Sequence, residues 1–335
     1  MRWDNLSVDA ERGRRLPGYR DEARVRRFDA PEALDIRFYE VRARSALNQV
    51  PERSRMPFRW TINPYRGCAH ACVYCFARPT HTYLDFNARE DFEREIVVKV
   101  NLPEVLRVEL ARPSWKREHV ALGTNTDPYQ WVESRYRLMP EVWAALLQSG
   151  TACSVLTKSP LVLRDIDVLR RLSERGGFTA NLSVPTLDEK AWRATEPHTP
   201  HPRKRLEAVA ELVRAGIPTG VLVAPLMPGI NDRPEQVERI LEIAGEAGAG
   251  HVAGVALHLR GEVRQIFFDW LRAHRPDLLE RYQRLYRRGA YMPRDEQERV
   301  TAPVRRGGSA SRARALPGSS PEEPEASVPA QAPLF

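Results

Sequence analysis

Three of the four cysteines, Cys68, Cys72 and Cys75, lie within eight positions of the chain, in the stretch CAHACVYC. This spacing lets one short loop bring three thiolates to a single inorganic centre. A conventional iron–sulfur cluster takes four cysteines. A cluster held by three would leave one iron open, so the spacing favours a metal centre with one ligand that is not protein.

Zinc is the alternative metal, and a structural zinc site takes four ligands. The fourth would have to be His70, His81 or the distant Cys153. Histidines of this kind more often satisfy backbone groups or face solvent. Cys153 opens an apolar run, where a free cysteine is more often a small buried hydrophobe. Zinc is therefore the weaker interpretation of the motif.

The composition predicts a soluble protein that is neither secreted nor embedded in a membrane. The 335 residues are 42% hydrophobic, which is enough for a sizeable core. The longest apolar run, GVLVAPLMPG, is too short to span a bilayer. Four cysteines, three of them in one motif, do not make a disulfide framework, so we expect a reducing, cytoplasmic location. The net charge of +8 permits a nucleic-acid partner.

The elements that must position the motif are six strand-then-helix units. Apolar runs typical of strands lie at residues 58–63, 119–125, 152–158, 178–184, 217–227 and 251–259. The segments between them carry apolar stripes of helical spacing, at Val237, Ile240, Leu241 and Ala244, at Val162, Ile166 and Leu169, and at Leu206, Val209 and Val213. Such units predict a parallel sheet, either open or curved into a barrel. Ligands then gather at the carboxyl ends of the strands, and the cysteine motif follows the first of them.

Three regions differ in character along the chain. Residues 1–57 are charged and irregular, with a short helix expected in IRFYEVRARSALNQ, and we interpret them as an N-terminal arm. Residues 58–290 form the α/β core domain. Residues 291–335 are rich in Pro, Ala, Ser and charge, and we expect a disordered tail because such a segment buries too little surface to offset its ordering entropy.

The motif CAHACVYC resembles the signature of the radical S-adenosylmethionine (radical SAM) superfamily. That resemblance implies that Cys68, Cys72 and Cys75 hold a [4Fe-4S] cluster, and that Tyr74 fills the aromatic position next to the cofactor. It also implies a partial (β/α)6 barrel similar to a TIM barrel. In this family the fourth iron binds the amino and carboxylate groups of S-adenosylmethionine, which is cleaved to methionine and a 5′-deoxyadenosyl radical. An electron donor such as flavodoxin or ferredoxin is implied as well.

Several later segments resemble the spore-photolyase-like branch of that family. They are GTNTDPYQ, VLTKSP, NLSVPT, EPHTPHPRKRLEAVAELVRAGIP and VLVAPLMPGIND, in this order between residues 123 and 232. The resemblance makes Thr126, Asp127, Lys158 and Ser183 candidate contacts for S-adenosylmethionine, with Asn181 and Ala224 as weaker ones. An ammonium suits the cofactor carboxylate and a hydroxyl suits its ribose. The alternatives are that Asp127 forms a turn before Pro128 and that Lys158 is a solvated loop charge.

One position departs from the spore photolyases. There, a cysteine just before the Thr-Asp segment returns a hydrogen atom to the repaired thymine, whereas this chain has Thr124. A threonine hydroxyl does not perform the radical chemistry of a thiol. Repair of the spore photoproduct itself is therefore not predicted, although the scaffold and radical generation are.

The chain ends in QAPLF, where Gln331, Leu334 and Phe335 match the short peptides with which bacterial repair proteins bind the sliding clamp. An aliphatic–aromatic pair on a flexible tether suits a preformed pocket.

Three functions remain in competition. The first is a radical SAM enzyme that acts on nucleic acid, in DNA repair or base modification. The second has the same chemistry on a peptide, RNA or metabolite. The third is a non-catalytic, zinc-stabilised protein that binds nucleic acid.

Overall fold

The structure of the protein is a computed structural model that describes residues 7–52, 54, 56–175 and 177–314. Its main sheet holds six parallel strands that follow one another in chain order, as the sequence predicts. They are β5 (Trp60–Ile62), β8 (Val120–Leu122), β9 (Cys153–Thr157), β10 (Phe178–Ser183), β11 (Thr219–Leu226) and β12 (His251–Ala256). A seventh strand, β4 (Leu47–Gln49), pairs antiparallel with β5. The sheet is a partial barrel whose first and last strands do not pair.

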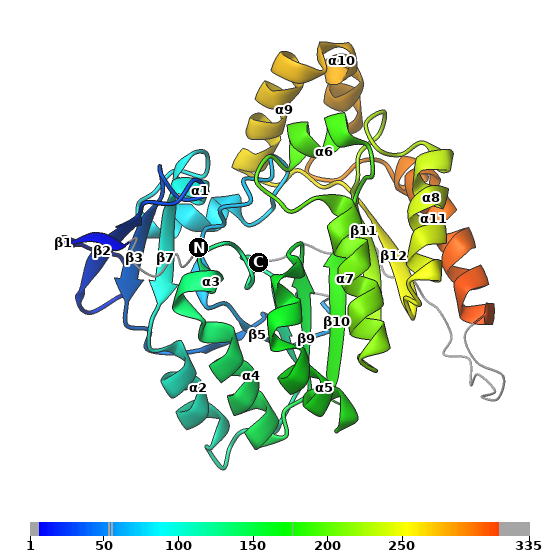
Figure 1. Cartoon of the computed structure of the whole chain (residues 1–335). Helices are drawn as coiled ribbons and strands as arrows, with labels where there is room; N and C mark the ends of the chain where they lie inside the picture. Colours follow the sequence, from blue (N-terminus) through cyan, green and yellow to red (C-terminus); the bar gives the residue numbers. More distant parts are fainter. Residues whose placement is uncertain (1–6, 53, 55, 176, 315–335) are drawn as a thin grey trace.

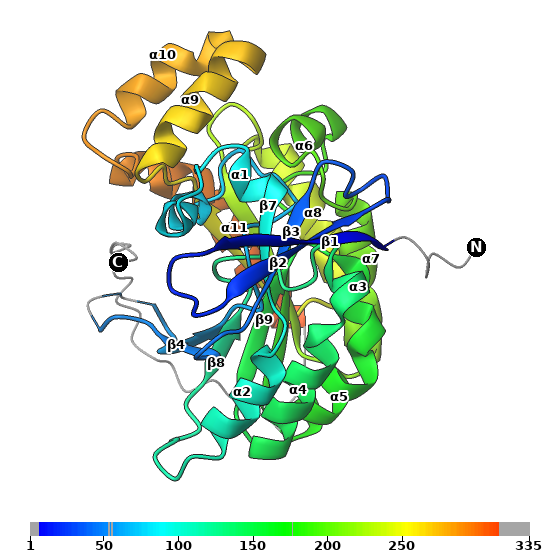
Figure 2. The same ribbon diagram turned by 90° about the vertical axis from the view of Figure 1, so that its left-hand side faces the viewer.

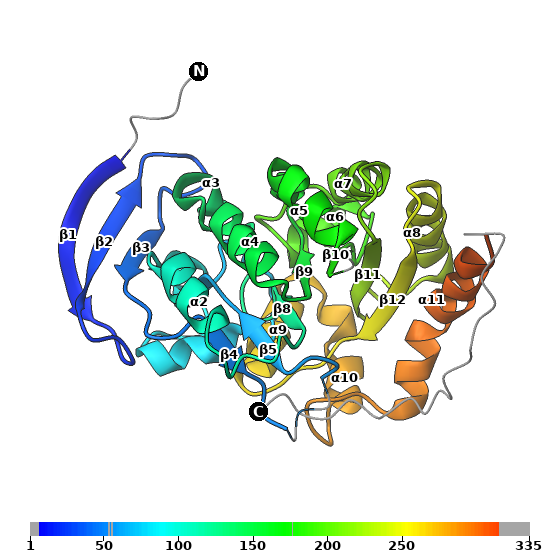
Figure 3. The ribbon, with the colours of Figure 1, turned by 90° about the horizontal axis from the view of Figure 1, so that it is seen from below.

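Helices cover the outer face of this curved sheet (Figures 1 and 3). The long ones are α2 (Leu102–Leu110), α4 (Leu138–Ser149), α5 (Ile166–Glu174), α7 (Pro202–Arg214) and α8 (Pro234–Glu246). The predicted stripe on α8 is confirmed, because Val237, Ile240 and Ala244 are fully buried in the main core. Gly216 and Gly248, which follow α7 and α8, have positive φ, as expected of glycines that end helices.

Shorter elements complete the barrel. They are η1 (Arg78–Leu84), α1 (Asp91–Arg94), α3 (Glu133–Tyr136), η2 (Pro160–Asp165) and α6 (Glu189–Thr195). Beyond β12, α9 (Glu262–His274) and α10 (Pro276–Leu285) form a helical pair that projects from the barrel. No helix in the described part of the chain is long and apolar enough to cross a membrane.

The N-terminal arm is largely a sheet, and the helix expected in residues 36–49 is wrong. That segment holds β3 (Arg37–Val41) and β4. β1 (Ser7–Arg15) pairs with β2 (Glu22–Phe28), and β2 pairs with β3, as Figure 2 shows from the side of the arm. The sheet continues from β3 to β7 (Glu95–Lys99) and then to β6 (Tyr65–Arg66). The pairing of β3 explains the difference, because Arg37–Val41 lies in parallel register with Glu95–Lys99 of β7, a partner far away in the sequence.

The predicted tail begins later than residue 291, because α11 spans Arg294–Arg314. Val300 and Val304, one turn apart, are buried in the main core, and Val304 packs against Gly254 of β12. The outer face of the last strand thereby gains a helix that the composition does not suggest. The peptide at Gln331, Leu334 and Phe335 lies outside the described residues.

The two faces of the barrel strands differ in exposure. On β9 and β10, the residues that face the helices, such as Val155 and Ala180, are buried in the core. The alternate residues Ser154, Leu156 and Asn181 remain part-exposed. The inner face of the barrel is therefore open to solvent and partly polar, which suits a ligand-binding interior.

Candidate active site

The cysteine motif forms a loop directly after β6, beyond the carboxyl end of β5. Cys68 and Cys72 are buried, and Cys75 is half-buried. The Cys68 amide donates to the Phe92 carbonyl at 2.9 Å, and the Cys75 amide donates to the Cys72 carbonyl at 3.2 Å. The loop is thus fixed both to α1 and to itself.

A buried arginine that the sequence reasoning missed holds this loop from inside. The Arg78 guanidinium donates to the carbonyls of Ala71 at 3.1 Å and Cys72 at 3.0 Å, and it pairs with Glu93 at 2.6 Å. An arginine three residues after the last cysteine of the motif is the only sequence signal. Its role follows from backbone carbonyls that a loop without regular structure leaves unpaired.

The chemistry of the three buried thiols fits an iron–sulfur cluster. Burial raises the pKa of Cys68, Cys72 and Cys75, that of Cys72 to about 12, so the thiolates need a metal to supply positive charge. Three cysteines in one loop suit a [4Fe-4S] cluster, in which each cysteine would bind a different iron atom.

The segment GTNTDPYQ anchors the cysteine loop at the end of β8. Thr126 Oγ1 donates to the Gly67 carbonyl at 2.7 Å. The Gln130 side chain accepts from the Ala69 amide at 2.9 Å and donates to Thr126 Oγ1 at 3.0 Å. Gln130, which the sequence reasoning did not single out, is fully buried at this contact.

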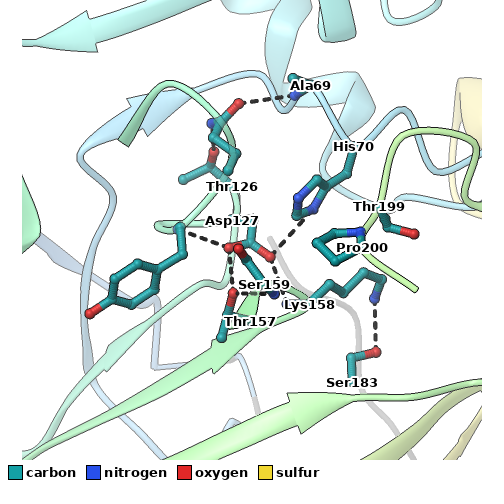
Figure 4. Close-up of polar contacts among 12 residues, drawn as sticks. Ala69, His70, Thr126, Asp127, Thr157, Lys158, Ser159, Ser183, Thr199 and Pro200 are labelled. Atoms are coloured by element: carbon teal, nitrogen blue, oxygen red, sulfur yellow. Dashed lines mark hydrogen bonds and ion pairs between the residues drawn. The ribbon is translucent and has the colours of Figure 1, made fainter. Parts of the chain in front are cut away.

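Asp127 joins the ends of β8 and β9 (Figure 4). Its carboxylate accepts from Thr157 Oγ1 at 2.6 Å and from the backbone amides of Tyr129 at 2.9 Å and Lys158 at 2.8 Å. His70 Nδ1 lies 3.4 Å from the same carboxylate. Burial lowers the pKa of His70 despite the attraction of Asp127, so the ring is neutral at neutral pH. Asp127 therefore forms a turn, which was the alternative to a cofactor contact, and it also orients His70.

Lys158, Ser183 and Tyr74, three of the candidate cofactor contacts, lie close together. Lys158 Nζ donates to Ser183 Oγ at 2.8 Å (Figure 4). It also lies 5.8 Å from the centre of the Tyr74 ring. Ser183 Oγ in turn donates to the Ala224 carbonyl at 3.1 Å. The side chains come from the ends of β9 and β10 and from the cysteine loop. An ammonium and a hydroxyl next to a three-cysteine loop can bind a carboxylate and polar groups of a small molecule.

A buried ion pair beneath these three residues was missed from the sequence. Glu196 accepts from the Tyr74 hydroxyl, lies 3.5 Å from Lys158 Nζ and pairs with Arg205 at 2.7 Å. Burial opposes ionisation of Glu196, but Arg205 and Lys158 outweigh it and lower the pKa to about 2. One signal was present in the sequence, because Arg205 lies on the face of α7 that carries the buried residues Ala208, Val209 and Leu212.

The remaining candidates lie apart from this contact group. Asn181 Oδ1 contacts His251 Nε2 at 2.8 Å on the inner face of the barrel. Thr124 Oγ1 is buried without a hydrogen-bond partner in the described part of the chain. Cys153 is buried in the main core, as expected. His81 contacts the Glu95 carbonyl at 3.0 Å through Nε2 and stacks on Phe86, which is a structural role.

Gly123 is required where β8 ends, and replacing it by alanine should destabilise the fold. Its φ is +87°, and an added Cβ would lie 1.9 Å from the Leu156 carbonyl oxygen. We expect a loss of roughly 3 kcal/mol or more in the free energy of unfolding, measured by urea titration. Gly216→Ala is the matched control, because its φ is +78° but nothing lies within 4 Å of the added Cβ. Equal losses in both variants would contradict the packing argument.

The chain is similar in sequence to a known protein family and to several proteins. The model of the radical SAM superfamily matches residues 62–244. An uncharacterised protein of Mycobacterium tuberculosis is 45% identical over 96% of this chain and 94% of its own length. The radical SAM Nalpha-GlyT isomerase of Pseudomonas phage M6 is 25% identical over 56% of this chain and 37% of its own.

Among solved structures, spore photoproduct lyase complexed with dinucleoside spore photoproduct has the same fold. The TM-score is 0.62 at 15% identity, over 81% of this chain and 78% of that one. The family model covers the cysteine loop and the ends of β8 to β11, where the candidate side chains lie. The chain belongs to the radical SAM superfamily and is an enzyme whose cofactors are a [4Fe-4S] cluster and S-adenosylmethionine.

Proposed function

We propose that this radical SAM enzyme acts on nucleic acid, in the modification or repair of a base. The observation that carries the chemistry is the three-cysteine loop beside Lys158 and Ser183 at the ends of β9 and β10. Its fold neighbour, spore photoproduct lyase, was solved with a dinucleoside ligand, which supports a nucleic-acid substrate. The net charge of +8 and the exposed Arg287 and Arg288 add to that support.

Each residue of the site has a proposed task. Cys68, Cys72 and Cys75 bind the cluster and leave one iron for S-adenosylmethionine. When bound, this pair supplies a 5′-deoxyadenosyl radical by reductive cleavage. Lys158 offers its ammonium to the cofactor carboxylate, and Ser183 and Tyr74 line the same pocket. Thr126 and Asp127 position the segments around the cofactor. The Thr126 side chain bonds to Gly67 and the Asp127 side chain bonds to β9.

Thr124 sets the limit of the analogy with spore photoproduct lyase. The reaction must return or replace the abstracted hydrogen atom without a thiol at this position. A base modification that ends in a new bond, or a repair that takes its hydrogen atom from another group, meets this condition. A peptide or metabolite substrate is the alternative, and the electron donor is a small redox protein such as flavodoxin or ferredoxin.

A DNA-binding measurement distinguishes a DNA substrate from a peptide or metabolite substrate. We expect the reconstituted protein to bind single-stranded, duplex or irradiated DNA, with an affinity that falls as salt rises because phosphate contacts release counterions. Fluorescence anisotropy between 50 and 200 mM salt is the measurement, and we expect a loss of at least about tenfold. Absent binding, or an affinity that salt does not change, would reject DNA as the substrate.

Lys158→Met should weaken S-adenosylmethionine binding by about 10- to 100-fold, the size of effect expected when a charge-assisted contact is lost. Equilibrium dialysis with the cluster-loaded protein measures it. Lys190→Met is the control, because Lys190 is exposed on α6. If both variants bind the cofactor as the wild type does, Lys158 has no role in its binding.

The terminal peptide with Gln331, Leu334 and Phe335 stays a prediction. A synthetic peptide of this sequence should bind the bacterial sliding clamp, and a version with Leu334 and Phe335 replaced by alanine should not.

A further inference from the structure

Three aromatic rings from separate segments meet beside the cysteine loop. Phe76, the residue after Cys75, lies 5.8 Å from His258 between ring centres, at an interplanar angle of 37°. His258 stacks on Tyr291 at 5.8 Å and 27°. We name Phe76, His258 and Tyr291 the ring stack. It connects a residue next to a cluster ligand with the end of β12 and the loop after α10.

The backbone fixes the ring stack in place. His258 and Tyr291 form an antiparallel bridge, and the Leu259 amide donates to the Ala290 carbonyl at 2.8 Å. The adjoining Gly261 lies against η1, because a Cβ added there would be 3.8 Å from Pro79. The rings are thus held where the last strand of the barrel approaches the segment that follows the cysteine loop.

The ring stack is accessible and uncharged. All three rings are half-buried, whereas the large aromatics of the core, such as Tyr282 and Phe267, are fully buried. Burial lowers the pKa of His258, and Arg260 lowers it further, so the ring is neutral at pH 7. Neutral, half-exposed aromatic faces bind other flat apolar faces by stacking.

We propose that the ring stack binds a nucleobase of single-stranded or extruded nucleic acid and holds it beside the cluster loop. Every base has a π-face, so stacking on such rings is tolerant of sequence. Phe76 directly follows the cluster ligand Cys75, so a base stacked on Phe76 would lie close to the cluster. Arg287 and Arg288 are exposed four and three residues before Tyr291, so the same segment offers cations for the flanking phosphates. This inference rests on the proposed nucleic-acid substrate and adds how the base is recognised.

The test compares two probes that carry the same phosphates. One is a fluorescein-labelled octamer of deoxythymidine, and the other is an octamer of abasic tetrahydrofuran nucleotides. Binding is measured by anisotropy with the cluster-loaded protein and S-adenosylmethionine, without reductant. We expect the wild type to prefer the thymidine octamer. Tyr291→Ala should weaken binding of that octamer by about 5- to 150-fold, the range for loss of one stacked base, and should change binding of the abasic octamer less than about twofold.

Two further variants exclude a general disturbance. Tyr291→Phe keeps the ring and should bind the thymidine octamer as the wild type does. Tyr83→Ala removes an aromatic that is 66% exposed on η1, outside the ring stack, and should change nothing. If the wild type binds both octamers alike, or if Tyr291→Ala and His258→Ala both keep the preference, the ring stack does not bind bases while the proposed substrate class stands. If the wild type binds neither octamer, both proposals fail.

Discussion

Replacing Cys72 by alanine is expected to abolish cluster binding and to lower formation of 5′-deoxyadenosine by more than about 100-fold. Even loss of a residue that only supports a metal ligand costs about 10- to 100-fold in affinity or activity, and loss of a ligand should cost more. Cys72 is buried in the loop after β6, with Cys75 bonded to its carbonyl. The measurements are iron and sulfide per chain after anaerobic reconstitution, and product formation with dithionite.

The chain supplies its own control for this experiment. Cys153 is a free, fully buried cysteine at the start of β9, whereas the side chains that contact the cysteine loop follow the carboxyl end of that strand. Cys153→Ala should keep the full iron content and lose only about 1 kcal/mol of stability from a small cavity. A Cys72→Ala protein that still binds iron and cleaves S-adenosylmethionine would show that the loop is not the cluster site.

Replacing Arg205 by methionine is expected to lower the free energy of unfolding by about 3–5 kcal/mol, because it leaves the buried Glu196 without its partner. Both side chains are fully buried, and Arg205 also donates to the Ser183 carbonyl at 2.9 Å and to Thr199 at 2.6 Å. The same loss should disturb Lys158 and Tyr74, which contact Glu196. Urea titration of the wild type and the variant measures the difference.

The pH dependence of this difference follows from Glu196. In the wild type its pKa is lowered from 4.5 to about 2, so its stabilisation is complete above the unfolded value and is lost as pH falls toward 2. Burial raises the pKa of Glu196 and the charge of Arg205 lowers it, so the pKa rises when Arg205 is replaced. The difference in stability between wild type and variant should therefore be largest near pH 7 and smaller near pH 3.

An exposed arginine on the same helix is the matched control. Arg214 pairs with Glu211 on the solvent side of α7, and a surface pair contributes about 1 kcal/mol or less. Arg214→Met should therefore leave stability nearly unchanged at every pH. Arg205→Met with an effect as small as that would mean that the buried pair does not hold the pocket together.

The sequence predicts the barrel well because its signals are local. Each of the six strands is a short apolar run, and stripes such as Val237, Ile240 and Ala244 identify the helices between them. The arm was less predictable because β3 pairs with β7, more than 50 residues later in the chain. A local sequence pattern does not predict which distant strand a strand pairs with. α11 was missed because its polar composition hides Val300 and Val304, which are buried only by contact with β12 and its neighbours.

In the site as well, the features set by local sequence were predictable and those set by distant contacts were not. The cysteine spacing and the convergence of Lys158 with Ser183 follow from motifs placed at strand ends. Arg78, Gln130 and Glu196 act by bonding to groups that the fold brings near, so their residue types alone do not mark them. Asp127 was assigned to the cofactor, yet its carboxylate bonds to Thr157 and to two backbone amides.

The central claim, a radical enzyme that takes a hydrogen atom from nucleic acid, is tested most directly by isotope transfer. DNA and RNA from a deletion strain grown in heavy water would be incubated in ordinary water with the reconstituted enzyme, S-adenosylmethionine and dithionite. We predict that 5′-deoxyadenosine formed with one of these polymers gains deuterium, detected by mass spectrometry. Formation of 5′-deoxyadenosine that carries no deuterium from either polymer would contradict the claim.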